Sequence, residues 1–98
     1  MTLQQDTAKN ESKFLHKYLD FADKRVLEIG CGEGRLTWQY AGETNWVTGV
    51  DLDMDALRVA SIERAADLEG TVSLACADSI HLPFRTEEFD LAIFAWSF

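Results

Sequence analysis

Short apolar runs alternate with amphipathic stretches along most of the chain. In the amphipathic stretches the apolar side chains recur every three or four residues, the spacing that places them on one face of a helix. The apolar runs are residues 25–29, 46–50, 71–76 and 89–96, and the amphipathic stretches are residues 7–20, 35–41 and 55–68. The pattern therefore predicts four buried strands and three helices, with residues 78–88 forming mostly loop.

The alternation of strands and helices indicates a parallel sheet. Parallel strands need crossover connections, and right-handed crossovers pack helices against the sheet. The predicted strands are apolar throughout, which is typical of strands that helices cover on both faces. We therefore predict an α/β fold, a Rossmann-like doubly wound parallel sheet with strand order 3-2-1-4 and flanking helices. Such a fold has two halves, and this chain supplies one half and a single further strand, so we expect the sheet to be incomplete.

The predicted fourth strand, residues 89–96, is expected to lie at the edge of this sheet. A long apolar edge strand tends to pair with another chain. We therefore expect one of two situations. Either the chain associates with itself or a partner through this strand, or it is the front part of a longer protein, truncated after the fourth strand.

Length, composition and charge exclude several classes of protein. With 98 residues, 47% hydrophobic and 27% charged, the chain is at most one globular domain. The net charge of −8 repels phosphate backbones and anionic membranes, which disfavours nucleic acid as a partner. No apolar run is long enough to span a bilayer, and the first residues do not form a secretory signal. Cys31 and Cys76 fit neither a disulfide framework nor a paired metal site, which indicates a reducing, cytoplasmic location and no metal.

The most informative segment runs from the first predicted strand through Gly30, Gly32 and Gly34 into a helix. Glycines at the carboxyl end of such a strand allow a ligand to approach the backbone. Asp51 follows Gly30 by 21 positions and ends the second strand. A carboxylate there can accept hydrogen bonds from both hydroxyl groups of a ribose. Spacing and context together predict a site for a nucleoside ligand.

A purely structural interpretation of the same residues stays open. The three glycines alone would make a tight turn between strand and helix. Asp51, Asp53 and Asp55 would then serve the start of the next helix, and we expect Asp53 and Asp55 to cap it in either case.

The ligand is not expected to be a dinucleotide, because that fingerprint needs a glycine at position 35, where this chain has Arg35. Residues 26–32, Val-Leu-Glu-Ile-Gly-Cys-Gly, instead resemble the signature of class I S-adenosylmethionine-dependent methyltransferases of the small-molecule type. The resemblance continues in order to residue 98. Its further motifs are residues 47–53, residues 75–78, residues 82–84 and residues 88–91.

The resemblance implies transfer of a methyl group from S-adenosylmethionine to a small-molecule acceptor. It implies an N-terminal helix over residues 1–23 and, over residues 24–98, the cofactor-binding half of a methyltransferase domain. In this family the acceptor site and any base come largely from the N-terminal helix and from segments after the fourth strand. We therefore assign no catalytic residue and expect this part alone to be inactive. Residues 95–98 lack the Asp/Asn-Pro-Pro-Tyr pattern, which disfavours a DNA base as acceptor.

For the methionine part of the cofactor, the resemblance implies contacts along the glycine segment. Gly30, Cys31 and Gly32 would pass beside it, and Glu28 would fix the loop or bind the amino group. Glu28 has an alternative role as a structural carboxylate that pairs with Lys24 or Arg25. For Cys31 a small buried filler is the simpler interpretation than a reactive thiol.

For the adenosine part, the resemblance implies four further residues. Asp51 would bind the ribose hydroxyl groups, and Leu52 would pack on the adenine face. Asp78 would accept a hydrogen bond from the adenine amino group, with Ser79 adjacent through its backbone. Asp78 has an alternative role as a turn residue. The acidic side chains suit a ligand that carries a sulfonium and an ammonium group.

Two other functions remain as alternatives. One is a noncatalytic nucleoside-binding or interaction module that acts through the exposed fourth strand. The other is a NAD-dependent oxidoreductase, which Arg35 disfavours.

Overall fold

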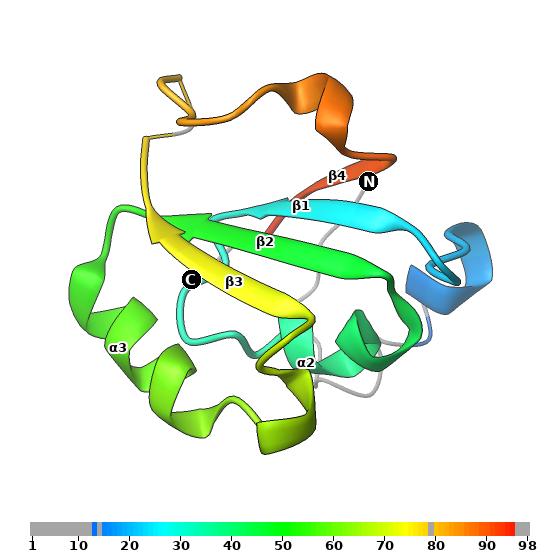
Figure 1. The fold of residues 1–98 in the computed structure, drawn as a ribbon, viewed down its shortest axis with the longest axis horizontal. Coiled ribbons are helices and arrows are strands. Elements are labelled where there is room, and N and C mark those ends of the chain that lie inside the picture. Colours follow the sequence, from blue (N-terminus) through cyan, green and yellow to red (C-terminus); the bar gives the residue numbers. More distant parts are fainter. Residues whose placement is uncertain (1–12, 14, 79, 96–98) are drawn as a thin grey trace.

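The computed structural model describes residues 13, 15–78 and 80–95. Strands and helices alternate along them as predicted, with short 3-10 turns between the longer elements (Figure 1). The elements in chain order are β1 (Arg25–Ile29), α2 (Thr37–Tyr40), η1 (Ala41–Glu43), β2 (Trp46–Asp51), α3 (Met54–Glu63), η2 (Ala66–Leu68), β3 (Val72–Cys76), η3 (Thr86–Glu88) and β4 (Leu91–Phe94). Within the described residues no helix is both long enough and apolar enough to cross a membrane.

The four strands form one parallel sheet in the order β3-β2-β1-β4, which confirms the predicted order and fold class. β1 lies between β2 and β4, and its last residue, Ile29, pairs with Val50 on one side and Phe94 on the other. This register brings the carboxyl ends of the three strands to the same edge of the sheet. Open parallel sheets bind their ligands at that edge.

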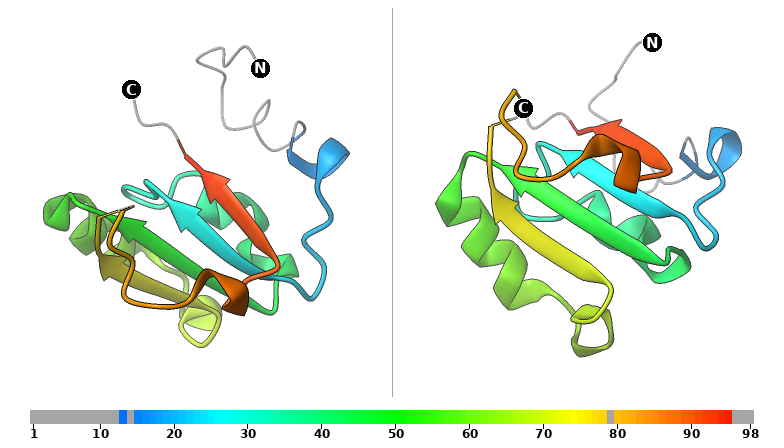
Figure 2. Two further views of the ribbon diagram at one scale, coloured as in Figure 1. Left: turned by 90° about the horizontal axis from the view of Figure 1, so that it is seen from above. Right: turned by 45° about the horizontal axis from the view of Figure 1, so that its top comes forward.

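The helices α2 and α3 lie on the same face of the sheet, below it in Figure 1, and the views in Figure 2 agree. Side chains from the strands, α2 and the N-terminal segment form the core on this face. The buried members are Leu15, Phe21, Val26, Leu36, Tyr40, Ala41, Val47 and Val72. The opposite face is crossed by the segment from residue 80 to residue 90, which contains η3. Among the described residues, the expectation that helices flank both faces therefore holds for one face only.

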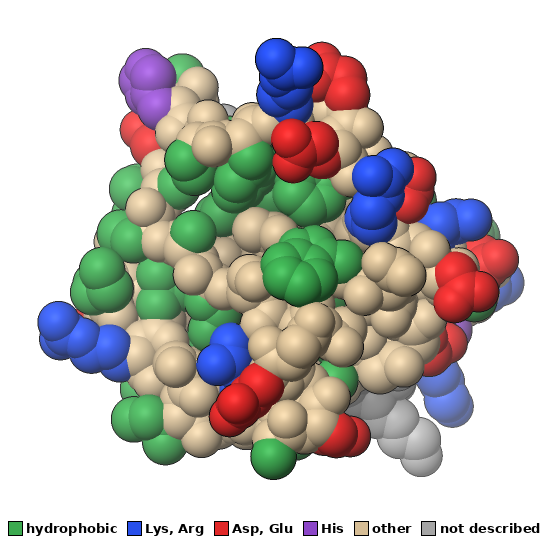
Figure 3. Space-filling model, viewed as in Figure 1, with side chains coloured by type: hydrophobic (Ala, Val, Ile, Leu, Met, Phe, Trp, Pro, Cys, Tyr) green, Lys and Arg blue, Asp and Glu red, His purple; other side chains and the backbone are tan. Residues whose placement is uncertain are grey.

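The opposite face and the β4 edge leave apolar side chains exposed. Figure 3 shows hydrophobic side chains beneath the segment that crosses this face. Trp46 is 37% exposed, and Phe94, at the end of the edge strand, is 62% exposed. β4 occupies the middle of the predicted run 89–96. Self-association through β4 and a domain boundary after residue 23 stay predictions.

The N-terminal segment packs on the core from the side of α2. Residues 13 and 15–18 are helical, and the rest of the predicted helix over residues 7–20 lies largely outside the described residues. Leu15 is buried, and Phe21 stacks on Tyr40 with ring centroids 4.5 Å apart. These contacts join the start of the chain to the helix that follows the glycine segment.

Two helices are shorter than the sequence predicts. α2 begins at Thr37 rather than at residue 35, because the turn that contains Gly34 extends into the following residues. α3 ends at Glu63 rather than at residue 68, because Arg64 has a ψ angle of 122°. The Arg64 guanidinium donates a hydrogen bond to the carbonyl oxygen of Val72 at 2.9 Å. That bond holds the chain in position for its return into β3.

Candidate functional site

A turn built on three glycines joins β1 to α2. Gly30, Gly32 and Gly34 have φ angles of +80°, +54° and +86°, a region that residues with a Cβ rarely adopt. The backbone N–H groups of Gly30 and Cys31 both donate to the carbonyl oxygen of Val50, at 2.8 and 3.1 Å. The glycine turn is therefore anchored on the end of β2, and its conformation requires glycine.

The three glycines differ in what surrounds them. A Cβ at Gly30 would lie 2.7 Å from the carbonyl oxygen of Ala95, and one at Gly34 would lie 2.5 Å from the Trp38 ring. At Gly32 the nearest atom would be Oδ2 of Asp51, at 3.9 Å. Gly30 and Gly34 are thus packed tightly against protein, whereas an added Cβ at Gly32 would meet only an ordinary van der Waals contact.

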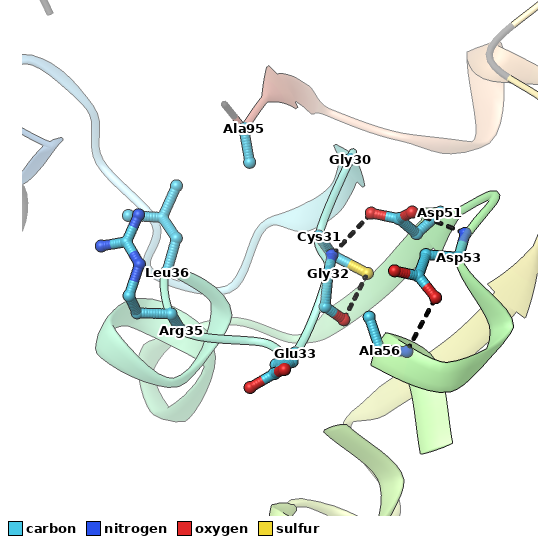
Figure 4. Close-up of a pocket in the computed structure, with 10 residues that line it drawn as sticks. All are labelled: Gly30, Cys31, Gly32, Glu33, Arg35, Leu36, Asp51, Asp53, Ala56 and Ala95. Carbon is cyan, nitrogen blue, oxygen red and sulfur yellow. Dashed lines mark hydrogen bonds between the residues drawn. The ribbon is translucent and has the colours of Figure 1, made fainter. Parts of the chain in front are cut away.

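Gly32 lines a cleft of about 350 Å³ at the carboxyl edge of the sheet (Figure 4). Its volume lies at the lower end of the range for small-molecule sites, about 300–1,000 Å³. The cleft is lined by Gly30, Cys31, Gly32, Glu33, Arg35, Leu36, Asp51, Asp53, Ala56 and Ala95. The cleft therefore brings together four of the predicted cofactor residues, Gly30, Cys31, Gly32 and Asp51.

Asp51 connects the two sides of this cleft. Its Oδ2 accepts a hydrogen bond from the N–H of Gly32 at 2.8 Å, and its Oδ1 accepts one from the N–H of Asp53 at 2.8 Å (Figure 4). A carboxylate has about four acceptor positions. Asp51 can therefore hold the glycine turn and still accept hydrogen bonds from a ligand's hydroxyl groups.

The acidic residues after Asp51 have separate roles. Asp53 caps α3, because its Oδ1 accepts the N–H groups of Asp55 and Ala56 at 3.0 and 3.1 Å, which confirms the predicted cap. The predicted capping by Asp55 is wrong. Asp55 lies inside the first turn of α3, where its carboxylate accepts a hydrogen bond from Arg58 at 3.1 Å.

Cys31 is a buried residue whose side chain packs against β2. A Cβ at Gly49 would lie only 2.9 Å from its Sγ, so the absence of a side chain at Gly49 makes room for the thiol. Burial raises the pKa of Cys31 to about 12, and the negative charges of Glu28 and Asp51 act in the same direction. These surroundings favour the interpretation of Cys31 as a small filler and oppose a reactive thiolate.

Glu28 lies in β1 beneath the glycine turn and is fully buried. Its Oε1 accepts hydrogen bonds from the hydroxyl groups of Thr37, at 2.9 Å, and Tyr40. Burial and the nearby Glu28 charge raise the pKa of Tyr40. Arg25, the suggested alternative partner of Glu28, donates instead to Asp90, with its backbone N–H 2.9 Å from Oδ2. Glu28 does not line the cleft; it fastens α2 to β1 and thereby supports the loop.

Leu52 and Asp78, which were predicted to contact adenine, are not among the residues that line the cleft. Leu52 follows β2 and is 69% exposed. Oδ1 of Asp78 accepts the N–H of Ile80 at 2.9 Å, and its carbonyl oxygen accepts the N–H of His81 at 3.1 Å, which is the turn role considered for this residue. Ser79 lies outside the described residues. The adenine contacts therefore stay predictions.

Several lining residues were not predicted as site residues. Glu33, Arg35 and Leu36 directly follow or interrupt the glycines, so the motif itself was a signal for them. Ala95 reaches the cleft from the end of β4. Only the pairing of β4 with β1 places it there, and no local pattern carries that information.

Comparison with known proteins identifies the family of this chain. The family model described as "Methyltransferase domain" matches residues 26–98. Methyltransferase GfsG of Streptomyces halstedii is 37% identical over 79 residues, which cover 78% of this chain and 28% of that protein. A ubiquinone biosynthesis O-methyltransferase of Hydrogenovibrio crunogenus is 32% identical over 81 residues, 81% of this chain and 33% of that protein. The chain thus spans about a third of the length of these relatives or less.

Solved structures give the same result. The YcgJ protein from Bacillus subtilis matches with a TM-score of 0.75 and 25% identity, over 88% of this chain and 37% of that one. An S-adenosylmethionine-dependent methyltransferase from Clostridium acetobutylicum matches with a TM-score of 0.73 and 26% identity, over 92% and 37%. The sheet order, the glycine turn, the family model and these relatives agree, and the chain therefore belongs to the class I S-adenosylmethionine-dependent methyltransferases.

Proposed function

We propose that this chain binds S-adenosylmethionine in the cleft and forms the cofactor-binding half of an enzyme that methylates a small molecule. The observation that carries the proposal is the position of Asp51. Its carboxylate lines the cleft at the end of β2, is fixed by Gly32 and Asp53, and keeps acceptor capacity. A ribose needs such an acceptor for its two hydroxyl groups.

The residues of the cleft fit the cofactor in a consistent direction. Asp51 would accept from the ribose hydroxyl groups. The backbone at Gly32, which has no side chain and lines the cleft together with Gly30 and Leu36, would lie along the methionine part. Buried Glu28 would act indirectly, through the Thr37 and Tyr40 hydroxyl groups that set the position of α2. Leu52, Asp78 and Ser79 would contribute to the adenine site, as the sequence resemblance implies.

The bound cofactor would supply an activated methyl group for in-line displacement by a nucleophilic O, N, C or S atom of the acceptor. The contribution of this chain is to hold the cofactor in one orientation in a partly enclosed site. A small-molecule acceptor is supported by the name of the ubiquinone biosynthesis O-methyltransferase relative. We assign no catalytic base and expect the 98-residue chain alone to transfer no measurable methyl group.

The proposal is tested by isothermal titration of S-adenosylhomocysteine into the protein, with thermal unfolding as a second readout. We expect saturable heat and a higher midpoint of unfolding. Asp51→Asn should weaken binding about tenfold, the effect of losing a charged hydrogen bond. Asp55→Asn is the matched control, since it removes the same charge from an exposed residue outside the cleft. No heat and no thermal shift with the wild-type chain would refute the proposal, and tighter binding of NAD would favour the oxidoreductase instead.

We also propose a cytoplasmic location, on chemical grounds alone. Both Cys31 and Cys76 are free thiols, and Cys76 is exposed. A reducing compartment keeps such thiols from pairing.

A further inference from the structure

We propose that the N-terminal segment, residues 15–23, holds the glycine turn in its ligand-binding form through Phe21 and Tyr40, so that docking of this segment and binding of the cofactor strengthen each other. The inference rests on the proposed function. It makes Phe21 and Tyr40 positioning residues. Neither is among the residues that line the cleft, and both act through the Glu28 carboxylate beneath the turn.

Phe21 and Tyr40 form a buried aromatic pair between the N-terminal segment and α2. Their ring planes are 17° apart, their centroids are 4.5 Å apart, and each residue is 1% exposed. Protein interiors are close-packed, so a shift of one stacked ring displaces the other. The position of Tyr40 therefore depends on the docking of Phe21.

The Tyr40 hydroxyl group extends this dependence to the strand before the turn. It donates to Oε1 of Glu28, which is fully buried in β1 and also accepts from the hydroxyl group of Thr37. These hydrogen bonds tie the first turn of α2 to β1, and the glycine turn lies between the two. Leu36, directly before α2, lines the cleft. A shift of α2 would therefore change the shape of the cleft.

The remaining contacts of the segment are weaker. Nε2 of His16 is hydrogen-bonded to Oε2 of Glu43 in η1, and the N–H of Asp23 donates to the carbonyl oxygen of Glu43 at 3.2 Å. The side chains of His16 and Glu43 are 32% and 51% exposed, and contacts between charged groups so open to water contribute little. Burial of Leu15 and Phe21 thus holds most of the segment in place, which allows it to open locally while the sheet stays folded.

Thermodynamic linkage makes the coupling between docking and binding reciprocal. If the undocked chain binds S-adenosylhomocysteine less tightly by some factor, saturating ligand must suppress opening of the segment by the same factor. Amide hydrogen exchange measures this local opening directly. A segment that only stabilised the fold would not respond in this way, because its opening would leave the affinity for the ligand unchanged.

The first test is amide hydrogen exchange followed by NMR, with and without saturating S-adenosylhomocysteine. The reporting amides are those of Leu19 and Lys24, whose N–H groups donate to the carbonyl oxygens of Leu15 and Phe21. The control amide is that of Leu68 in η2, at the end of the sheet away from the cleft. We expect the ligand to slow exchange at the reporting amides about tenfold, within the range for coupled sites, and to leave local exchange at Leu68 unchanged.

The second test places the effect on the proposed route. Phe21→Leu loosens the stack, whereas Tyr40→Phe keeps both rings and removes only the hydroxyl group that reaches Glu28. Each should weaken binding of S-adenosylhomocysteine about fivefold to tenfold in isothermal titration of the folded variant, and Tyr40→Phe should also abolish the slowing of exchange. Val72→Ala is the matched control. It removes buried side-chain volume at the amino end of β3, and should lower the unfolding midpoint without changing the affinity.

Three outcomes would overturn the inference while the proposed function stands. They are unchanged exchange of the reporting amides in a wild-type chain that binds the ligand, unchanged affinity in both folded variants, and an equal loss of affinity in Val72→Ala, which would indicate general destabilisation. If the wild-type chain binds no S-adenosylhomocysteine, the proposed function fails and the inference fails with it.

Discussion

Replacing Gly34 with alanine tests whether the glycine turn is held by the packing described above. Gly34 has a φ angle of +86°, and an added Cβ would lie 2.5 Å from Cζ2, 2.6 Å from Cε2 and 2.9 Å from Nε1 of Trp38. Two costs therefore act together. The alanine backbone is strained at this angle, and the indole ring must move away from its place against the core.

The magnitude follows from these two costs. A residue with a Cβ in the left-handed region loses about 1–2 kcal/mol. Overpacking that displaces a neighbouring side chain costs about 1–3 kcal/mol more. We therefore expect Gly34→Ala to lower the free energy of unfolding by about 2–5 kcal/mol. A domain of this size is stable by only about 5–15 kcal/mol, so the change is a large fraction of the total.

Urea unfolding followed by far-ultraviolet circular dichroism measures this loss. The matched control is Gly42→Ala, because Gly42 is exposed in η1, has no positive φ angle, and has nothing within 4 Å of an added Cβ. That change should stabilise the chain by about 0.4–1 kcal/mol, through the unfolded state. Equal midpoints for the two variants would refute the reasoning.

A second variant separates the ring contact from the backbone strain. Trp38→Phe reduces the size of the side chain opposite Gly34. The two substitutions should then couple by about 1 kcal/mol or more in a double-mutant cycle, since the contact is direct. Strict additivity would show that the loss comes from the backbone angle alone.

Three further predictions follow from the described contacts. Tyr40→Phe removes a hydrogen-bond donor to the buried Glu28 carboxylate and should lower the free energy of unfolding, measured by urea titration, by about 1.5–3 kcal/mol. An unchanged unfolding midpoint would show that this hydrogen bond does not contribute to stability. At pH 8, iodoacetamide should label exposed Cys76 and spare buried Cys31, whose pKa is raised to about 12, with both labelled equally in denaturant; rapid labelling of both in the native state would contradict the burial. Hydrogen bonds from the backbone and guanidinium of Arg25 lower the pKa of Asp90, so the stability that this carboxylate contributes is present above its unfolded pKa and is lost as pH falls through its folded pKa. Asp90→Asn should therefore flatten the acid limb of a plot of unfolding free energy against pH. A curve identical to that of the wild type would argue against the contribution of this pair.

Local sequence patterns were sufficient to predict the strands, their order and the glycine turn. β1 coincides with the apolar run that predicted it, because its three middle residues, 26–28, are buried in a strand that lies between two others. The ends of α2 and α3 were less predictable. They depend on Gly34 and Arg64, whose partners Trp38 and Val72 are fixed only by packing and by the return of the chain.

In the candidate site, too, some features could be predicted from the sequence and others could not. Gly30, Gly32 and Asp51 were predicted from spacing, and the structure places all three in one cleft. The hydrogen bonds from Thr37 and Tyr40 to a strand carboxylate were not predicted. They join β1 to α2, and neither hydroxyl stands in a recognisable motif. Side-chain contacts between two elements can be predicted only when the positions of both elements in the fold are known.

Asp51 belongs to the proposed ligand site and also stabilises the fold. Asp51 fixes the glycine turn through Gly32 and also forms part of an acidic cleft, in which its charge lies close to that of Asp53. Such like charges are unfavourable while the cleft is empty, and a ligand with an ammonium group would relieve the repulsion. A ligand that binds only the folded state stabilises it by about 2.7 kcal/mol when the free ligand concentration is about one hundred times the dissociation constant. Saturating ligand could thus offset a loss of stability of the size expected for Gly34→Ala. It would do so only if Gly32 in the variant still donates its hydrogen bond to Asp51. The rise in the unfolding midpoint of this variant on adding ligand therefore reports whether its glycine turn keeps the native geometry.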